Sequence, residues 1–357
     1  MWLATASLLA TPAAGGPPQT QGQVQVSLDM DEARAAVALI EALAAGRTPD
    51  EAEWQALFAS QGYRRLKQRE AAMKRDFTDA EFRAFLSAPE TRARAASLRA
   101  ALDRWQADPS GAAAARALAY LPPGTTLRAT IFPMVKPKPN EFVFDLAGDP
   151  AIFLMLNPAV LPEKAANTLA HELHHIGMGA ACGARSPDGE SARRLLLGWL
   201  SAYGEGLAML AAAGGPAIHP HADSDAGERA EWDRNAASFA TEMAEQDAWF
   251  RSVLAGTAGD EAAIAAKMRG YFGTQGPWYT VGWRMARTIE INLGRARTID
   301  AFCRPATLLA TYNQAAALQE RRGGTRLPRW DATLAARLAG PPTGRRASAC
   351  AAARHDA

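Results

Sequence analysis

Apolar and polar residues recur along the first third of the chain with the period of a helix. From residue 28 to about residue 120, Ala and Leu return every three or four positions with Arg and Glu between them, which predicts several amphipathic helices. Two helix starts are marked by a Thr cap with a Glu three residues later, at Thr48–Glu51 and Thr78–Glu81. Residues 21–120 are therefore interpreted as a helical N-terminal region that serves as scaffold.

The pattern changes after the turn sequence at 121–124. Three short stretches rich in Ile, Phe, Val and Leu follow at 126–135, 141–146 and 151–156, separated by Pro, Asn, Gly and Asp. This spacing predicts a small, largely antiparallel sheet.

Helical periodicity then returns for the rest of the chain. One helix is predicted from Pro162 to about Ile176, ended by Gly177 and Gly179, and another at 191–213. Further helices are predicted at 225–254, 261–271, 279–293 and 305–322.

These elements predict a mainly α-helical chain with a small antiparallel sheet, which is an α+β fold. We expect a core region at 121–275 and a helical C-terminal region at 276–340. Residues 341–357, rich in Pro, Gly, Arg and Ala, are predicted to be a disordered tail.

The charge of the chain limits its partners. Lys and Arg number 39 against 37 Asp and Glu, a formal net charge of +2. So close a balance argues against nucleic acid as the main partner. The stretch 195–215 is apolar and long enough to cross a bilayer, but its interior holds Gly198, Gly204 and Gly206, with Glu205 near the middle. We therefore expect a buried helix and no stable membrane span.

The N-terminus and the cysteines bear on the cellular location. Residues 1–20 are an apolar run followed by small residues and prolines, as in a signal peptide, although no basic residue precedes the run. This predicts a secreted or periplasmic protein, with a disordered N-terminus as the alternative. Cys182, Cys303 and Cys350 allow three different single disulfides and have no metal-ligand spacing.

The chemistry of the chain is concentrated in one predicted helix. The whole chain has six histidines, and three of them, His171, His174 and His175, lie in this helix. His171 and His175 are four residues apart and share one helix face, so both imidazoles can bind one zinc ion. Glu172 flanks that face, where its carboxylate can reach a metal-bound water. The pattern is His-Glu-x-x-His, and the flanking apolar residues predict a buried helix in which unpaired histidines would be costly.

A catalytic zinc needs a third protein ligand and one open position. The position where a metzincin would supply a third histidine is Ala181, so that class is not supported. Glu205 is the better candidate, because it is the lone carboxylate in an apolar helix whose small neighbouring side chains would let two helices approach closely.

This set of residues resembles the gluzincin group of zinc metallopeptidases, and it is most similar to uncharacterised bacterial families of zinc-dependent peptidases. The resemblance covers roughly residues 132–293 and implies a zincin-like core. It also implies a role for Tyr279, in a Tyr-x-x-Gly element, in stabilising the tetrahedral intermediate. The chain departs from thermolysin-like enzymes at Met209, where they carry an acidic residue.

The expected activity is zinc-dependent hydrolysis of a peptide or protein substrate. One Zn²⁺ per chain would be held by His171, His175 and Glu205, with Glu172 as general base for a zinc-bound water. The predicted strand at 151–156 would offer an edge for an extended substrate.

Two alternatives were weighed. One is a catalytically inactive, zincin-like zinc-binding or interaction protein, in which His219 or His221 would be an additional ligand. The other is a di-iron site, because Glu172 and His175 also form Glu-x-x-His; the sequence holds no second copy of that motif, which argues against it.

Overall fold

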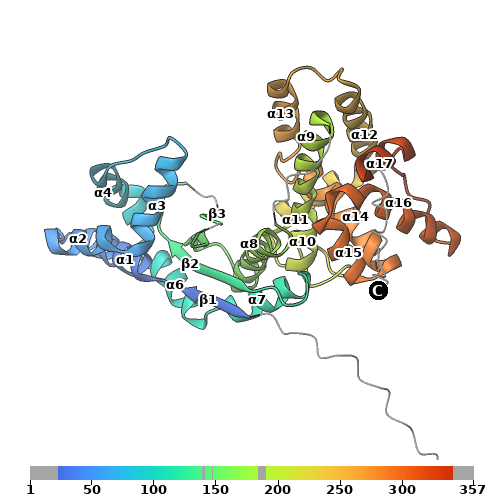
Figure 1. Ribbon diagram of the computed structural model, residues 1–357. Coiled ribbons are helices and arrows are strands. Elements are labelled where there is room, and N and C mark those ends of the chain that lie inside the picture. Colours follow the sequence, from blue (N-terminus) through green and yellow to red (C-terminus); the bar gives the residue numbers. More distant parts are fainter. Residues whose placement is uncertain (1–22, 139–140, 147, 184–189, 341–357) are drawn as a thin grey trace, which may run out of the picture.

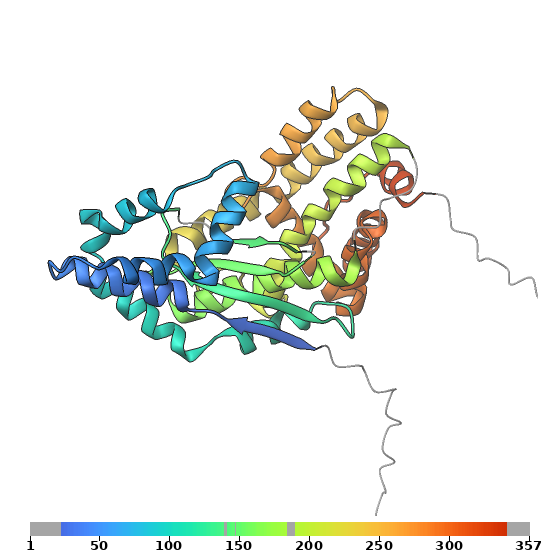
Figure 2. The same cartoon turned by 60° about the vertical axis from the view of Figure 1, so that its left-hand side comes forward.

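The computed structural model describes residues 23–138, 141–146, 148–183 and 190–340. Most of them lie in helices around one small sheet, which confirms the α+β fold class (Figure 1). In Figure 1 helices α1–α4 (31–87) lie on one side of the sheet and the C-terminal helices on the other, with α8 (Pro162–Cys182) between them; Figure 2 shows the same elements turned by 60°. The predicted signal peptide, the predicted tail and Cys350 lie outside the described residues.

The N-terminal region is helical, as predicted. The capping box predicted at Thr78 is present: the Thr78 hydroxyl accepts from the backbone amide of Glu81, and the Glu81 carboxylate accepts from the backbone amide of Thr78. The box predicted at Thr48 is wrong, because the helix begins two residues later and Asp50 pairs with Glu53. The elements are β1 (Val24–Leu28), α1 (Asp31–Ala44), α2 (Glu51–Ala59), α3 (Gln61–Ala72), α4 (Asp79–Ser87), α5 (Pro89–Arg92), α6 (Ala95–Arg104), η1 (Trp105–Ala107) and α7 (Ser110–Leu118).

The sheet has four strands in the order β1-β2-β4-β3, where β2 is Leu127–Met134, β3 is Phe142–Phe144 and β4 is Ala151–Met155. The three predicted strands are present, but the expected antiparallel pairing is wrong for two of the three pairs. β2 pairs in parallel with β1 and β4, and only β3 and β4 are antiparallel. The reason is topological: helices α1–α7 carry the chain from β1 to β2, and β4 is inserted between β2 and β3. Because β4 is an inner strand, it has no free edge for a substrate.

The second half of the chain is a set of helices that is joined to α8 mainly through α10. The predicted helix at 191–213 is broken by a 3₁₀ turn, and two short helices, α15 and α17, were not predicted. The elements are α9 (Ser191–Leu200), η2 (Ser201–Tyr203), α10 (Gly204–Ala213), α11 (Ala226–Ala237), α12 (Phe239–Ala255), α13 (Glu261–Gly270), α14 (Pro277–Leu293), α15 (Arg295–Cys303), α16 (Pro305–Arg321) and α17 (Ala332–Ala339).

Helix α8 continues past Gly177, where the sequence predicted its end. A Cβ at Gly177 would lie 2.2 Å from a methyl group of Leu121 and 2.8 Å from one of Leu127. This glycine therefore serves close packing of α8 on the chain that leads into β2, and it does not stop the helix.

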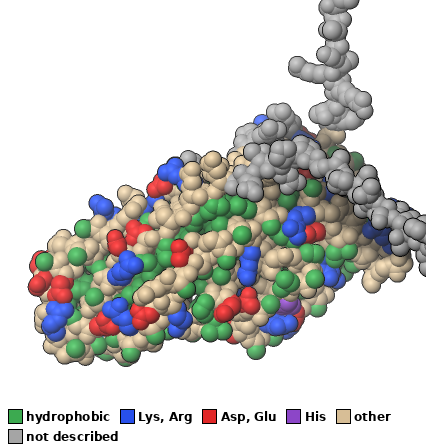
Figure 3. Space-filling model, turned by 90° about the horizontal axis from the view of Figure 1, so that it is seen from below, with side chains coloured by type: hydrophobic (Ala, Val, Ile, Leu, Met, Phe, Trp, Pro, Cys, Tyr) green, Lys and Arg blue, Asp and Glu red, His purple; other side chains and the backbone are tan. Residues whose placement is uncertain are grey.

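One segment of the described chain, Ser191–Ala213, is long and apolar enough to cross a membrane. Of its most apolar window, 61% is buried inside the protein, as in a core helix. On the face shown in Figure 3, basic and acidic side chains are interspersed among apolar ones, in keeping with the balanced charge.

Two hydrophobic cores meet at α8. One joins the N-terminal helices, the sheet and the apolar face of α8, where Leu169, Leu173 and Ile176 are buried. The other joins the C-terminal helices around Tyr203, Trp278 and their neighbours. A disulfide between Cys182 and Cys303 ties the end of α8 to α15, which settles the pairing that the sequence left open.

Candidate metal centre

The His-Glu-x-x-His motif lies on the face of α8 that turns away from the core formed by the sheet and the N-terminal helices. His171 and His175 lie one turn apart on that face, and their side chains are 13% and 27% exposed. Glu172 is half-buried beside them. The apolar residues that alternate with the motif anchor the helix in the core, so the polar side chains point toward the C-terminal helices.

Glu205 reaches the two histidines from the first turn of α10. Its Oε2 lies 3.2 Å from Nε2 of His171 and 3.1 Å from Nε2 of His175. The two Nε2 atoms are 2.9 Å apart. Within the described ranges, these three residues are the group of His, Cys, Asp and Glu side chains that converge closely enough to hold an ion.

The three donor atoms fit a metal ion. With bonds of about 2.0–2.1 Å, ligands of a tetrahedral zinc lie about 3.3 Å from one another, close to the observed separations. Two neutral imidazole nitrogens and a carboxylate oxygen would repel at this distance, and a shared cation removes that repulsion. Three protein ligands also leave one position open, as a catalytic zinc requires.

The close approach of these side chains also shifts the pKa values of His175 and Glu205. Burial disfavours charge on His175, yet the neighbouring Glu205 carboxylate raises the pKa of His175 to about 9. Burial would raise the pKa of Glu205, but the two histidines hold it well below its usual range. Without metal, the site therefore keeps a carboxylate beside a protonated imidazole, and a metal ion takes the place of that proton.

Tyr279 lies beside the three donors, on α14. Its ring is nearly parallel to that of His171, with centroids 6.4 Å apart. Burial, followed by the charge of Glu205 and a hydrogen bond to it, raises the pKa of Tyr279 well above its ordinary value. The phenol therefore keeps its proton at neutral pH and can donate it in a hydrogen bond.

A contact between two glycines sets the distance between α10 and α14. A Cβ at Gly206 would lie 1.9 Å from the backbone nitrogen of Trp283, and one at Gly282 would lie 2.7 Å from the carbonyl oxygen of Tyr203. The backbones of the two helices thus touch next to Glu205 and one turn from Tyr279. This contact brings the third ligand and the phenol to the same site.

The third histidine of the motif has a role that the sequence did not indicate. His174 is fully buried, and its Nε2 donates to the carbonyl oxygen of Tyr120 across 3.2 Å, with the tautomer assigned from that partner. Burial lowers the pKa of His174 to about 3, so the ring is neutral. The contact fastens α8 to the segment after α7, and it was missed because its partner is a backbone carbonyl distant in sequence.

His219 and His221, which the sequence raised as additional ligands, lie in a separate network. Nε2 of His219 is 2.9 Å from Asp233, and Nδ1 of His221 is 2.9 Å from the hydroxyl of Ser224. Lys164 of α8 donates to the same hydroxyl. Neither histidine belongs to the converging group of three, so the structure does not support them as ligands.

A cavity of about 520 Å³ lies along the N-terminal half of α8. Its lining includes Thr168, one turn before His171, and Met155 at the end of β4. Glu141 also lines it, directly before β3. The cavity is large enough to hold several residues of an extended ligand, although the three donors themselves do not line it.

Comparison with known proteins supports the same chemistry. No curated protein and no solved structure gives a significant match to this sequence. A family model does match, over residues 54–320, which is most of the chain and includes all five candidate site residues. The family is described as "putative zinc dependent peptidase", and the chain belongs to this family, DUF5700.

Proposed function

We propose that this protein hydrolyses peptide bonds with one zinc ion held by His171, His175 and Glu205. The observation that carries the proposal is the convergence of these three donors within 3.2 Å, with Glu172 on the same helix. Family membership and the gluzincin-like spacing support it.

The roles of the residues follow from their positions. Bound zinc would act as a Lewis acid on the scissile carbonyl and lower the pKa of water. Glu172 takes a proton from the attacking water and passes it to the leaving amine nitrogen. Tyr279, which stays protonated, donates a hydrogen bond to the carbonyl oxygen as that atom gains negative charge.

The substrate is an extended peptide that adds to β3. In the described part of the sheet, β3 pairs only with β4, so its other side is a sheet edge, and α8 is in contact with this strand. Main-chain hydrogen bonds to this edge would place a peptide between β3 and the metal ligands. β3 thus takes the part that the sequence analysis gave to the strand at 151–156.

The Cys182–Cys303 disulfide supports export of the protein, since such bonds persist in oxidising compartments. A secreted or periplasmic location is in keeping with the signal-like sequence at 1–20.

The test is Glu172→Gln, with metal content and hydrolysis of fluorescently labelled casein measured on the same samples. We expect the variant to keep about one zinc per chain and to lose activity by roughly 100-fold or more, because only the base is removed. Glu261→Gln, the same change in the first turn of α13, is the control and should behave as wild type. A chelator should abolish the wild-type activity, and added zinc should restore it.

Retained activity in Glu172→Gln would refute the assignment of the base. A wild-type chain that binds zinc and cleaves neither casein nor a mixed peptide library would favour the inactive zinc-binding alternative.

A further inference from the structure

A second cavity lies on the far side of β3 from the metal ligands. Its volume is about 330 Å³, within the range of about 300–1,000 Å³ typical of ligand sites. Five apolar residues line it together with six charged ones: Leu66 from α3, Phe77 just before α4, Phe82 from α4, Phe142 from β3, and Pro137. We refer to it as the Phe142 cavity.

The cavity adjoins the free edge of β3. Phe142 is the first residue of the strand, and its ring lies under the guanidinium of Arg69 from α3, 3.8 Å from ring centroid to Cζ. Successive side chains of a strand point to opposite faces, so Val143 points to the face where α8 contacts β3. The two faces of this edge therefore lead to two different sites, the metal ligands and the Phe142 cavity.

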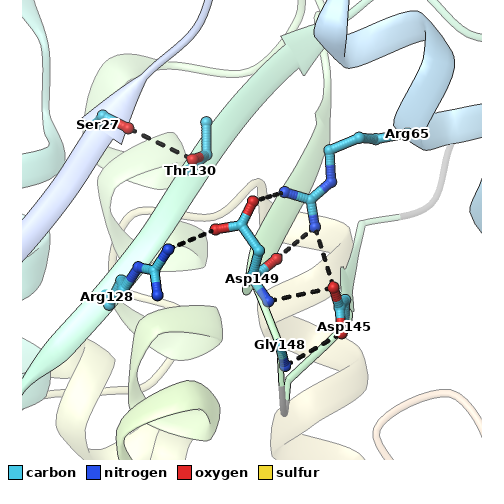
Figure 4. Close-up of polar contacts among 7 residues, drawn as sticks. All are labelled: Ser27, Arg65, Arg128, Thr130, Asp145, Gly148 and Asp149. Atoms are coloured by element: carbon cyan, nitrogen blue, oxygen red, sulfur yellow. Dashed lines mark hydrogen bonds and ion pairs between the residues drawn. The ribbon is translucent and has the colours of Figure 1, made fainter.

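The wall that carries Phe142 is fixed in place. Figure 4 shows Arg65 of α3, almost fully buried, bound to the carboxylate of Asp149 at 2.5 Å and close to Asp145. Asp145 accepts from the amides of Gly148 and Asp149, and Arg128 of β2 binds the other oxygen of Asp149. These bonds hold the end of β3 and the start of β4 against α3, so the cavity exists before any ligand arrives.

The cavity and the metal site are also linked through Glu141. Burial raises the pKa of its carboxyl, Lys136 beside the Phe142 cavity lowers it, and Glu172 of the metal site raises it. Glu141 lines the cavity along α8, and the next residue, Phe142, lines the Phe142 cavity, so the start of β3 borders both cavities.

Several of the charged residues that line the cavity are paired with neighbouring groups. Glu70 binds Arg75 at 3.0 Å and Arg69, and Glu81 accepts from the amide of Thr78. Because these charged groups are paired, the binding free energy of a ligand would come mainly from burying the apolar part of the wall.

We propose that the Phe142 cavity is a specificity pocket that takes a bulky apolar side chain, above all an aromatic one, from a peptide paired to the outer edge of β3. The inference rests on the proposed function. Along a peptide strand, alternate side chains face α8 and α3, so a residue next to the one at the metal site points into the cavity. Three phenylalanine rings in the wall favour an aromatic guest.

The test measures binding separately from cleavage. Zinc-loaded Glu172→Gln chain is titrated with acetylated, amidated penta-alanine and with five peptides in which one Phe replaces each Ala in turn. We expect one Phe position to bind about tenfold more tightly than penta-alanine. Leu66→Trp, which fills the cavity, and Phe77→Ala, which removes a half-buried wall, should each abolish that difference. Phe85→Ala is the control, since Phe85 is half-buried on the same helix as Phe82 and does not line the cavity.

The outcomes separate the two proposals. A Phe preference lost in both cavity variants and kept in Phe85→Ala supports the pocket, even if the wild-type chain cleaves no peptide and the proposed function falls. The pocket is overturned if the preference for Phe is unchanged in Leu66→Trp and Phe77→Ala. It is also overturned if all six peptides bind equally or none binds, even if casein is cleaved.

Discussion

At the scale of single residues, the candidate site is a set of donors that are costly without a metal. Glu205 and the two imidazoles lie within 3.2 Å of one another, and all three are largely buried. Their arrangement explains why an otherwise apolar helix holds one carboxylate.

The first prediction concerns Glu205 as the third ligand. Glu205→Gln removes the charge and leaves a weaker ligand of the same shape, so zinc affinity should fall on the order of 100-fold or more. Glu205→Asp keeps the charge on a shorter side chain and should bind zinc with intermediate affinity. Competition with a zinc chelator of known affinity measures both. Equal affinity of wild type and Glu205→Gln would remove Glu205 from the ligand set.

Glu32 is a second residue whose surroundings predict a measurable effect. It is fully buried in the first turn of α1, where one oxygen accepts from the amide of Val135 at 3.1 Å and the other has no hydrogen-bond partner among the described residues. Burial raises the pKa of Glu32 from 4.5 to about 8. The folded chain therefore keeps this proton at pH values where the unfolded chain releases it.

The second prediction is the resulting pH dependence. The contribution of Glu32 to stability is complete below about pH 4.5 and is lost as the pH rises to about 8, because only the unfolded state ionises in that window. Glu32→Gln should remove this loss, so its free energy of unfolding at pH 9 should exceed that of wild type by on the order of 5 kcal/mol. Urea unfolding at pH 5, 7 and 9 measures it. Asp31→Asn, at an exposed neighbour, is the control, and parallel pH profiles of wild type and Glu32→Gln would contradict the prediction.

Much of the candidate site could be predicted from sequence, because its signals are local. The four-residue spacing of His171 and His175 fixes a shared helix face, and a lone carboxylate in an apolar helix draws attention to Glu205. The role of His174 could not be predicted, since its partner is a backbone carbonyl more than 50 residues away. Glu32 was missed for a similar reason, since its partner is the backbone amide of Val135, a residue distant in sequence.

At the scale of elements, the site depends on how closely α10 approaches α14. The two backbones touch at Gly206 and Gly282, beside Glu205 and Tyr279. Backbone atoms cannot turn aside as a flexible side chain can, so any Cβ at this contact must push the helices apart.

The third prediction tests this contact with Gly206→Ala. The added methyl would lie 1.9 Å from a backbone nitrogen, so the helices must separate and Glu205 must leave its position. We expect weaker zinc binding and a lower melting temperature. Gly204→Ala is the matched control on the same helix, because a Cβ there meets nothing within 4 Å; it should be neutral or stabilise by about 0.5–1 kcal/mol. Equal zinc affinity in the two variants would show that the contact does not position Glu205.

The sheet shows where element prediction fails. Each of the three predicted strands is present within two residues of its expected ends, because alternation and turn residues are local signals. Their pairing was wrong, because strand order depends on where helices α1–α7 carry the chain. β1 was missed because it is a short, mostly exposed edge strand in front of the helices.

At the scale of the whole molecule, α8 joins two cores. Its apolar face belongs to the core of the sheet and the N-terminal helices, and its polar face meets Glu205 from the second core. A metal held by both would link the two halves of the protein. The Cys182–Cys303 disulfide is a second link, from the end of α8 to α15.

The last prediction is that this disulfide stabilises the folded chain across the two halves. It closes a loop with a sequence separation of 121, and loops of this size give about 2–5 kcal/mol by restricting the unfolded chain. The Cys182→Ala/Cys303→Ala double variant should therefore unfold at lower urea than wild type, and a reductant should lower the wild-type midpoint while leaving the double variant unchanged. Cys350→Ala, which removes the cysteine outside this pair, should retain the wild-type midpoint and its response to reductant. Repeating the titrations with zinc present separates the two links: zinc should raise the midpoint of both chains, because His171, His175 and Glu205 remain intact in the double variant. A double variant with the wild-type midpoint would show that the disulfide does not contribute to stability.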